Sequence, residues 1–399
     1  MFFAGCNEEM ASAPGLRSPA SPAEAKFLQG MAASGQNLSP EIEIPLGKNI
    51  SIEFVLIPSG EFHMGSPNTE SLRQSDEGPL HQVKISKSFY MGKYEVTQLQ
   101  YNTVVGTQKD CHLKGDNLPV EEVDFFEVNS FLFRLSGKYG LKFRLPTEAE
   151  WEYACRAGTN TPFYTGETIS ASQANYDSRY VYGMGSRGIY LKMTAPVGSY
   201  PPNAFGLYDM HGNVWEWCSD WYISTYYHKM EMIDPVGPSD GHGHVIRGGS
   251  WNHDPKKLRS ADRNSRRSGA DRKLLGFRAV LEIPNSGSIK IPASVENIDT
   301  NSTHVQTGTK SEKAQFSDIP PKVSEPVEFE YNAETKMGYI SVKGKGPEAR
   351  AWMLKQIGEI CASKNIVIQE GTTSEPARFR VLSETFMDGK FTMKFEVVR

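Results

Sequence analysis

The stretch NAFGLYDMHGNVWEWCSDWY, from Asn203 to Tyr222, is the most distinctive part of this chain. It holds three of the chain's six tryptophans within seven residues, and polar residues alternate with them after a Gly-Asn turn. Aromatic side chains bury large areas, but tryptophan N–H groups need hydrogen-bond partners. The stretch therefore predicts a rigid, hydrogen-bonded centre of the fold rather than an apolar helix.

The length and composition limit the class of protein. A chain of 399 residues exceeds the usual size of one domain and favours one large domain with a smaller one. With 36 Gly, 24 Pro and 38% hydrophobic residues, it is expected to be globular and rich in loops. It has no apolar run of about 18 residues, so no membrane-spanning helix is predicted. The net charge of −4 argues against nucleic acid as a partner.

The first 45 residues predict a tether rather than a domain. Cys6 lies in FFAGC, which resembles the lipobox of bacterial lipoproteins, and a polar Ala/Ser/Pro-rich segment follows it up to about Pro45. This pattern predicts a lipid anchor on Cys6 and a location outside the cytoplasm, in the periplasm or at the cell surface. The alternative is a disordered N-terminus, because a signal peptide would need a longer basic and apolar region before the cysteine.

Local patterns predict the elements of the large domain. Residues 51–59 and 61–65 are expected to pair as a hairpin, and residues 81–91 to form one strand. Capping boxes predict three helices, which start at Thr97, Asp124 and Thr147. The third helix ends before Gly158, and its Cys155 is expected in the core. Residues 159–199 are expected to form long irregular loops.

The chain after residue 283 predicts a linker and a second domain. Residues 284–322 contain few large apolar side chains, which is typical of a flexible linker. Residues 323–399 predict a small βαβββ domain with a helix that begins at Pro347. The expected strands are residues 338–342, 366–368, 379–382 and 391–397. We see no catalytic pattern in this part, and expect it to serve docking or oligomerisation.

Three motifs in order resemble the signature of the formylglycine-generating enzyme, or sulfatase-modifying factor, family. They are GLYDMHGNVWEW at Gly206–Trp217, RGGSW at Arg247–Trp251 and GFR at Gly276–Arg278. The phrases GEFHMGS and RLPTEAEWEYA match the same family. The resemblance implies an α+β, loop-rich domain over residues 46–283, with a fold that resembles the C-type lectin fold.

The family's copper chemistry is not expected here. Members that make formylglycine are understood to hold copper(I) with two cysteines, five positions apart, shortly after the GGS triplet, because thiolates are soft ligands. This chain has no cysteine between Ser219 and Ile360. His253 stands in the place of the first cysteine, and the second falls near Leu258.

The resemblance also implies calcium. In the family one ion is held around the GNVWE turn, which corresponds to the carbonyls of Asp209, Gly212 and Val214 and the carboxylate of Glu216. The alternative is that Glu216 caps backbone N–H groups. A second family site would use Asn175 and the carbonyl of Tyr176, but no aspartate stands where it is expected, at residues 188–191.

Two further patterns have a functional and a structural interpretation. His242, His244 and His253, with Asp254 and His211, could bind a transition metal, or the GHGH segment could be a solvated turn. The segment from Asp254 to Lys273 carries eight cations and three acids, a local charge of +5. It could form an anion-binding rim for a peptide, sulfated or phosphorylated ligand. The favoured interpretation is a solvated loop, with Arg263 and Arg278 in structural ion pairs.

These observations favour a pseudoenzyme that binds a peptide or glycan ligand or scaffolds protein partners. The candidate pocket consists of Ser250, Trp251, Asn252, His253, Arg259 and Arg263. The alternative is a metal-dependent oxidoreductase of the non-heme iron type, acting on a protein or small molecule. A third possibility is formylglycine generation without the paired cysteines.

Overall fold

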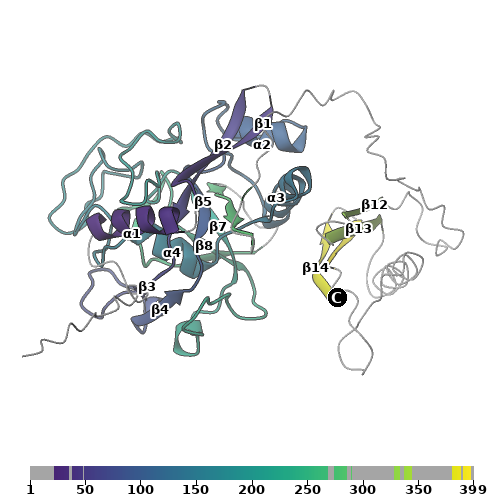
Figure 1. Ribbon diagram of the computed structural model, residues 1–399. Coiled ribbons are helices and arrows are strands. Elements are labelled where there is room, and N and C mark those ends of the chain that lie inside the picture. Colours follow the sequence, from purple (N-terminus) through teal and green to yellow (C-terminus); the bar gives the residue numbers. More distant parts are fainter. Residues whose placement is uncertain are drawn as a thin grey trace, which may run out of the picture. The chain divides into compact units, whose positions relative to one another are not determined.

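The computed structural model describes residues 22–35, 38–47, 49–267, 274–284 and 289, together with four strands between residues 328 and 396. The chain divides into two compact units, residues 1–300 and 301–399. The first unit combines helices and strands, so the α+β class is confirmed (Figure 1). In the described ranges, no helix has the length and apolar character needed to cross a membrane.

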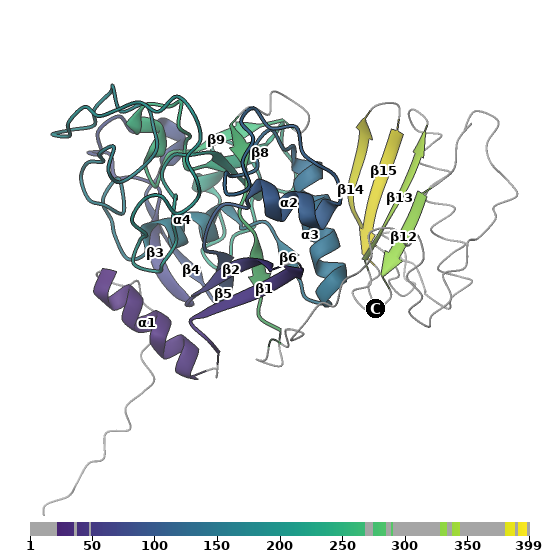
Figure 2. The same cartoon turned by 90° about the horizontal axis from the view of Figure 1, so that it is seen from above.

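Three of the four α-helices described in the first unit begin at the predicted capping boxes, and the first was not predicted. The four are α1 (Pro22–Gly35), α2 (Gln98–Val105), α3 (Phe125–Tyr139) and α4 (Glu148–Arg156). The predicted capping boxes at Thr97, Asp124 and Thr147 are all present, with side-chain and backbone bonds in both directions. Helices α2 and α3 contact each other and lie side by side in Figure 2. The three predicted helices are therefore confirmed.

Two sheets form the frame of this unit. The first is antiparallel, in the order β1 (Glu41–Gly47), β2 (Ile50–Ile57), β5 (Phe89–Gly92), β11 (Val280–Glu282) and β6 (Phe143–Arg144). The second has the order β10 (Leu275–Gly276), β7 (Trp215–Trp221), β8 (His244–Arg247) and β9 (Asn264–Arg266). A separate pair joins β3 (Gly60–Met64) and β4 (His81–Ile85). Short 3-10 helices are η1 (Ser75–Glu77), η2 (Tyr226–His228) and η3 (Pro255–Leu258).

Two strand predictions are wrong. The predicted hairpin of residues 51–59 and 61–65 does not form, because β2 pairs with β1 and β5 while β3 pairs with β4. The single strand predicted over residues 81–91 is two strands, β4 and β5, in different sheets. Periodicity indicates that these residues are extended, but the partner of each strand is set by contacts distant in sequence.

The predicted tether is also wrong for residues 22–45. Helix α1 packs on the unit, with Ala25 and Ala33 buried. The side chain of Gln29 donates to the carbonyls of Leu56 and Phe205 at 2.7 and 3.0 Å. Strand β1 is the first strand of the unit and pairs with β2. The folded unit therefore begins before residue 46, while Cys6 lies outside the described residues.

The second unit contains an antiparallel sheet. Its order is β12 (Glu328–Asn332), β13 (Met337–Lys343), β15 (Lys390–Glu396) and β14 (Arg380–Met387). Three of these strands overlap predicted ones, whereas β12 was not predicted. The predicted linker lies outside the described residues except for residues 284 and 289. The helix from Pro347 and the strand 366–368 lie outside them entirely. The βαβββ order and the role in docking or oligomerisation therefore stay predictions.

The tryptophan stretch occupies the core of the first unit. Trp215 and Trp217 on β7 are buried, as is Trp151 on α4. The indole N–H of Trp217 donates to the carbonyl of Val123 at 2.9 Å. Residues 157–214 form no helix or strand and produce the long teal loops of Figures 1 and 2, so the loops predicted over residues 159–199 are confirmed. The hydrogen-bonded centre that the sequence predicts is confirmed.

Candidate functional site

The GNVWEW turn fixes three segments through one side chain. Asn213 has a left-handed backbone, with φ of 58°. Its side-chain oxygen accepts hydrogen bonds from the side chain of Asn175 and the N–H of Ala195, at 3.1 and 2.9 Å. Its amide group donates to Glu95 at 2.6 Å, and its carbonyl accepts the N–H of Trp251 at 2.9 Å. The turn therefore aligns the loops that carry the candidate pocket.

The RGGSW segment needs its two glycines to bend back over the core. Gly248 and Gly249 both have positive φ, 92° and 75°. A Cβ on Gly249 would lie 2.8 Å from the carbonyl of Lys257 and from the side chain of Leu258. Only glycine suits this conformation and this close approach. The bend delivers Ser250 to a fully buried position.

Ser250, His253 and Trp215 form the buried part of the candidate site. The Ser250 hydroxyl shares a hydrogen bond of 2.6 Å with Nδ1 of His253. The His253 ring meets Trp215 edge-on, with centroids 5.3 Å apart, and the buried indole N–H of Trp215 has no described partner. Burial lowers the pKa of His253 to about 4, with a further contribution from the charge of Arg266. The imidazole is therefore neutral at pH 7 and can donate or accept a hydrogen bond.

An aromatic surface adjoins this buried group. The rings of Trp251 and Tyr190 are stacked, with centroids 6.1 Å apart. The guanidinium of Arg179 lies 4.5 Å from the Tyr190 ring centre and is held by the carboxylate of Asp177 at 2.6 and 2.8 Å. The hydroxyl of Tyr190 donates to the side-chain oxygen of Asn252. Tyr190 and Arg179 lie in a loop without a motif, so the sequence gives no signal for them, and Trp215 was predicted only as part of the core.

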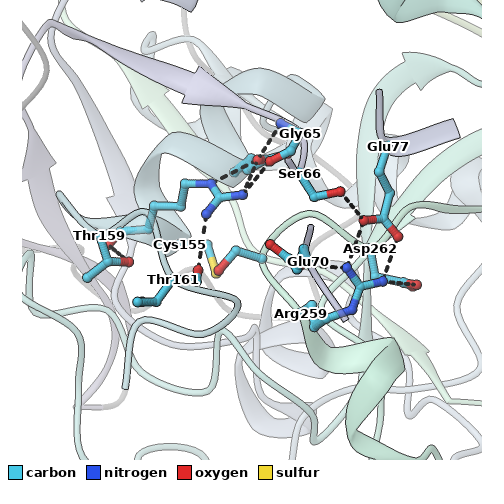
Figure 3. A network of polar contacts seen from close by, with 12 residues as sticks. Gly65, Ser66, Glu70, Glu77, Cys155, Thr159, Thr161, Arg259 and Asp262 are labelled. Atoms are coloured by element: carbon cyan, nitrogen blue, oxygen red, sulfur yellow. Dashed lines mark hydrogen bonds and ion pairs between the residues drawn. The ribbon is translucent and has the colours of Figure 1, made fainter. Parts of the chain in front are cut away.

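Arg259 does not belong to the predicted pocket. It is fully buried and donates to Glu70 and Glu77 at 2.6 to 2.7 Å, as Figure 3 shows. Asp262 lies beside it, and burial raises the pKa of that carboxyl to about 7 in spite of Lys257 and Arg259. The segment around Arg259 is therefore a buried ionic cluster.

Arg263 is likewise removed from the predicted pocket. Its guanidinium donates to both carboxylate oxygens of Glu148, at 2.7 and 2.8 Å, and is buried. For residues 258–263, the predictions of an anion-binding rim and of a solvated loop are both wrong. Arg259 and Arg263 are buried, and acids distant in sequence neutralise them. The predicted structural ion pairs of Arg263 and Arg278 are confirmed. Arg272 and Lys273 lie outside the described residues.

The histidines of the predicted transition-metal set lie apart. His244 is buried and stacked between Phe125 and Trp221, with centroids 3.5 and 3.9 Å away. His242 is exposed, and His253 contacts Trp215. The two ring nitrogens of His211 bind the carbonyl of Leu258 and the N–H of Tyr164, at 2.7 and 3.0 Å. Among the residues that the structure describes, no three His, Cys, Asp or Glu side chains gather as a metal-binding group. This histidine set is therefore wrong.

Glu216, the predicted carboxylate ligand of calcium, is held by three side-chain N–H donors. The guanidinium of Arg278 donates to both its oxygens, at 2.6 and 2.7 Å. The indole N–H of Trp151 donates to one of them at 2.7 Å. These three N–H donors leave about one of the roughly four acceptor sites of the carboxylate, so calcium at Glu216 stays a prediction. Capping of backbone N–H groups is not its role, because these donors are side chains.

The surroundings of Glu216 nevertheless carry surplus negative charge. Glu95 and Asp209 are buried beside it, so three carboxylates share the single guanidinium of Arg278. Burial raises the pKa of Glu95 well above its usual range, and the charges of Asp209 and Glu216 add to this. Burial also raises the pKa of Asp209 to about 6. A proton or a cation near the turn would relieve the repulsion among these carboxylates.

The doubtful second calcium site has one suitable atom. The side-chain oxygen of Asn175 is buried without a described partner, while its amide group donates to Met193 at 2.9 Å. The carbonyl of Tyr176 accepts the N–H of Ser178 at 2.8 Å. Residues 188–191 supply no carboxylate. A second calcium therefore stays a prediction that one side-chain oxygen supports.

The geometry agrees with a comparison against known proteins. Residues 46–283, more than half of the chain, match the model of the sulfatase-modifying factor enzyme 1-like domain. The chain belongs to this family. Where family members are understood to carry the second copper-binding cysteine, this member has Leu258, which packs in a buried apolar cluster.

Several relatives support this assignment. The formylglycine-generating enzyme of Streptomyces coelicolor is 31% identical over 56% of this chain and 87% of its own length. The solved structure of PvdO from Pseudomonas aeruginosa is 34% identical, with a TM-score of 0.53 over 61% of this chain and 99% of that chain. The serine/threonine-protein kinase pkn1 of Chlamydia pneumoniae is 34% identical over 61% of this chain. This chain spans only 40% of that kinase.

Proposed function

We propose that this protein is a family member without copper–thiolate chemistry that binds a peptide ligand on the surface formed by Trp251, Tyr190 and Asn252. The observation that carries the proposal is the stacked, partly exposed pair of Trp251 and Tyr190, with Trp251 on the same segment as His253. Tyr and Trp provide large, rigid contact areas at low entropic cost. The surface is therefore prepared to bind before the ligand arrives.

A peptide fits this surface better than a glycan. Sugar hydroxyls need free hydrogen-bond partners, and an unpaired polar group at a binding site lowers affinity. The hydroxyl of Tyr190 is already bonded to Asn252, and the guanidinium of Arg179 is bonded to Asp177. Apolar peptide side chains can pack on the rings without displacing these bonds. A glycan is retained as an outcome of the test.

Selection from a displayed peptide library on the full chain tests this proposal. For a selected peptide, Trp251→Ala should weaken binding by about 30-fold, because a central aromatic anchor contributes about 2 kcal/mol or more. Met232→Ala, an exposed side chain elsewhere, is the control and should leave the affinity unchanged. Calorimetry gives the dissociation constants. Binding to a glycan array with the same dependence on Trp251 would assign a glycan instead, and equal affinities of both variants would refute the site.

Formylglycine generation is not expected. A peptide that contains Cys-x-Pro-x-Arg should keep its thiol when incubated with this protein, with or without copper, because no cysteine follows the GGS triplet before Ile360. Mass spectrometry detects conversion as loss of the thiol mass. The Streptomyces coelicolor enzyme, run in parallel, serves as the positive control. Formation of the aldehyde by this protein would restore the third possibility.

We keep calcium as part of the proposal, held by the carbonyls of Asp209, Gly212 and Val214 and favoured by the nearby surplus negative charge. Bound calcium stabilises the native state by roughly 2.7 kcal/mol at a hundredfold excess over its dissociation constant. Chelation should therefore lower the melting temperature. Glu95→Gln should shrink this shift, because it removes one surplus carboxylate.

The matched control for calcium is Glu121→Gln. Glu121 is also buried, and its own environment raises its pKa through burial. This variant should keep the full calcium shift. A melting curve that chelation leaves unchanged would argue against calcium at this turn.

The cellular setting is part of the same proposal. We place the protein outside the cytoplasm, attached through a lipid on Cys6, with the second unit serving docking or oligomerisation. These statements depend on the lipobox resemblance and on composition alone. The alternative of a metal-dependent oxidoreductase is no longer supported by the histidine set. Metal analysis of the purified protein would test whether other residues bind a transition metal.

A further inference from the structure

One loop of the first unit displays apolar side chains to solvent. The loop of residues 180–193 holds six of the twelve large apolar side chains that are exposed in the described part of the chain. They are Tyr180, Val181, Met184, Ile189, Leu191 and Met193. Met184 is 98% exposed and Ile189 is 80% exposed. A concentration of this kind marks an interaction site rather than ordinary surface.

The base of this 180–193 loop is held firmly, so the apolar display is built into the fold. Tyr182 is buried, and its hydroxyl donates to the carbonyl of Ser71 at 2.6 Å. The N–H of Gly188 donates to the carbonyl of Ser178 at 2.9 Å. At the far end, Asn175 holds the carbonyl of Met193. Met184 and Ile189 are therefore presented outward by anchored backbone.

The charges of the loop have one sign. Residues 178–193 contain Arg179, Arg187 and Lys192 and no acid. Asp177 neutralises Arg179. Arg187 and Lys192 are exposed, and neither forms an ion pair with any part of the chain that the structure describes. Two unpaired cations thus flank the most exposed apolar side chains.

We infer that the 180–193 loop docks on an anionic phospholipid surface, with Met184 and Ile189 inserted at the interface and Arg187 and Lys192 against lipid phosphates. A peptide partner would need a concave groove, whereas side chains exposed to 98% and 80% project outward. A bilayer accepts projecting apolar groups, and its negative surface attracts the two cations. The loop also carries Tyr190 of the proposed peptide surface, but the side chains varied in the test below are not part of that surface.

Vesicle sedimentation with the full chain tests the inference. All variants carry Cys6→Ser, so that no lipid on the protein can cause binding. Vesicles that contain phosphatidylglycerol should bind the protein, and pure phosphatidylcholine vesicles should bind it more weakly. Met184→Ser with Ile189→Ser should weaken binding at least about tenfold. Arg187→Gln with Lys192→Gln should weaken it by about fivefold per charge, and only on the anionic vesicles.

The matched control is Met232→Ser with Ile233→Ser, which removes an exposed apolar pair from another loop and should change nothing. Absence of binding to both kinds of vesicle would overturn the inference. So would equal weakening by the control pair, or full binding by the Met184/Ile189 variant. Self-association that the Met184/Ile189 variant abolishes, seen by sedimentation velocity without vesicle binding, would assign the loop to a second copy of the chain and also overturn it.

Discussion

Replacing Glu152 by alanine is expected to destabilise the first unit by about 3–5 kcal/mol. Glu152 on α4 is fully buried and pairs with two buried guanidinium groups, Arg156 at 2.9 Å and Arg247. It also accepts the N–H of Gly65 at 2.9 Å. The change would leave Arg156 without its acid and Arg247 with only Glu148, at 3.4 Å. Buried charges without partners are costly because the interior cannot solvate them.

Denaturant unfolding followed by tryptophan fluorescence measures this loss, because five of the six tryptophans lie in residues 1–300. The control is Asp110→Ala, which removes the fully exposed acid of the Lys114 pair and should leave the unfolding midpoint unchanged. A fall of less than about 1 kcal/mol in the free energy of unfolding of Glu152→Ala would contradict the prediction, because contributions that small are typical of ion pairs on the surface.

Replacing Arg259 by methionine is expected to cost a similar amount, about 3–5 kcal/mol. The fully buried guanidinium joins Glu70 and Glu77 to the segment that carries Asp262 (Figure 3). Methionine fills much of the volume of the arginine side chain but leaves these carboxylates without a positively charged partner. The loop of residues 66–77 should then open, and limited proteolysis should cut it faster than in the wild-type protein.

The loss of stability in the Arg259 variant should depend on pH. Burial raises the pKa of Asp262 to about 7 and also raises the pKa of Glu70. An acid whose pKa is raised in the folded state favours folding while protonated, and that contribution is lost as the pH rises through the folded-state pKa. The free energy of unfolding of the variant should therefore be lower at about pH 8 than at about pH 5. Lys256→Met, a neighbouring cation that is 46% exposed, is the control and should show neither effect. A loss that does not change with pH would contradict this account.

The sequence alone determined the family and the three helices that start at capping boxes, but not α1. Each capping box depends on two side chains three residues apart, such as Thr97 with Gln100, so the chemistry that starts a helix is readable locally. The tryptophan stretch likewise predicted its own burial, because so many aromatic groups in a short segment need a core. The same locality showed that the thiolates expected after the GGS triplet are absent.

Only the tertiary structure decided what the charged and aromatic side chains contact. Arg259 stands in a run of cations that suggests a solvated or ligand-binding surface, yet its acids, Glu70 and Glu77, are more than 180 residues away in sequence. The stacking of Tyr190 on Trp251 also joins two segments that are separate in sequence, and the partners of the strands are chosen in the same way. Ion pairs and ring contacts act over a few ångströms of space, so a sequence pattern can state which groups need partners, but the folded chain alone supplies them.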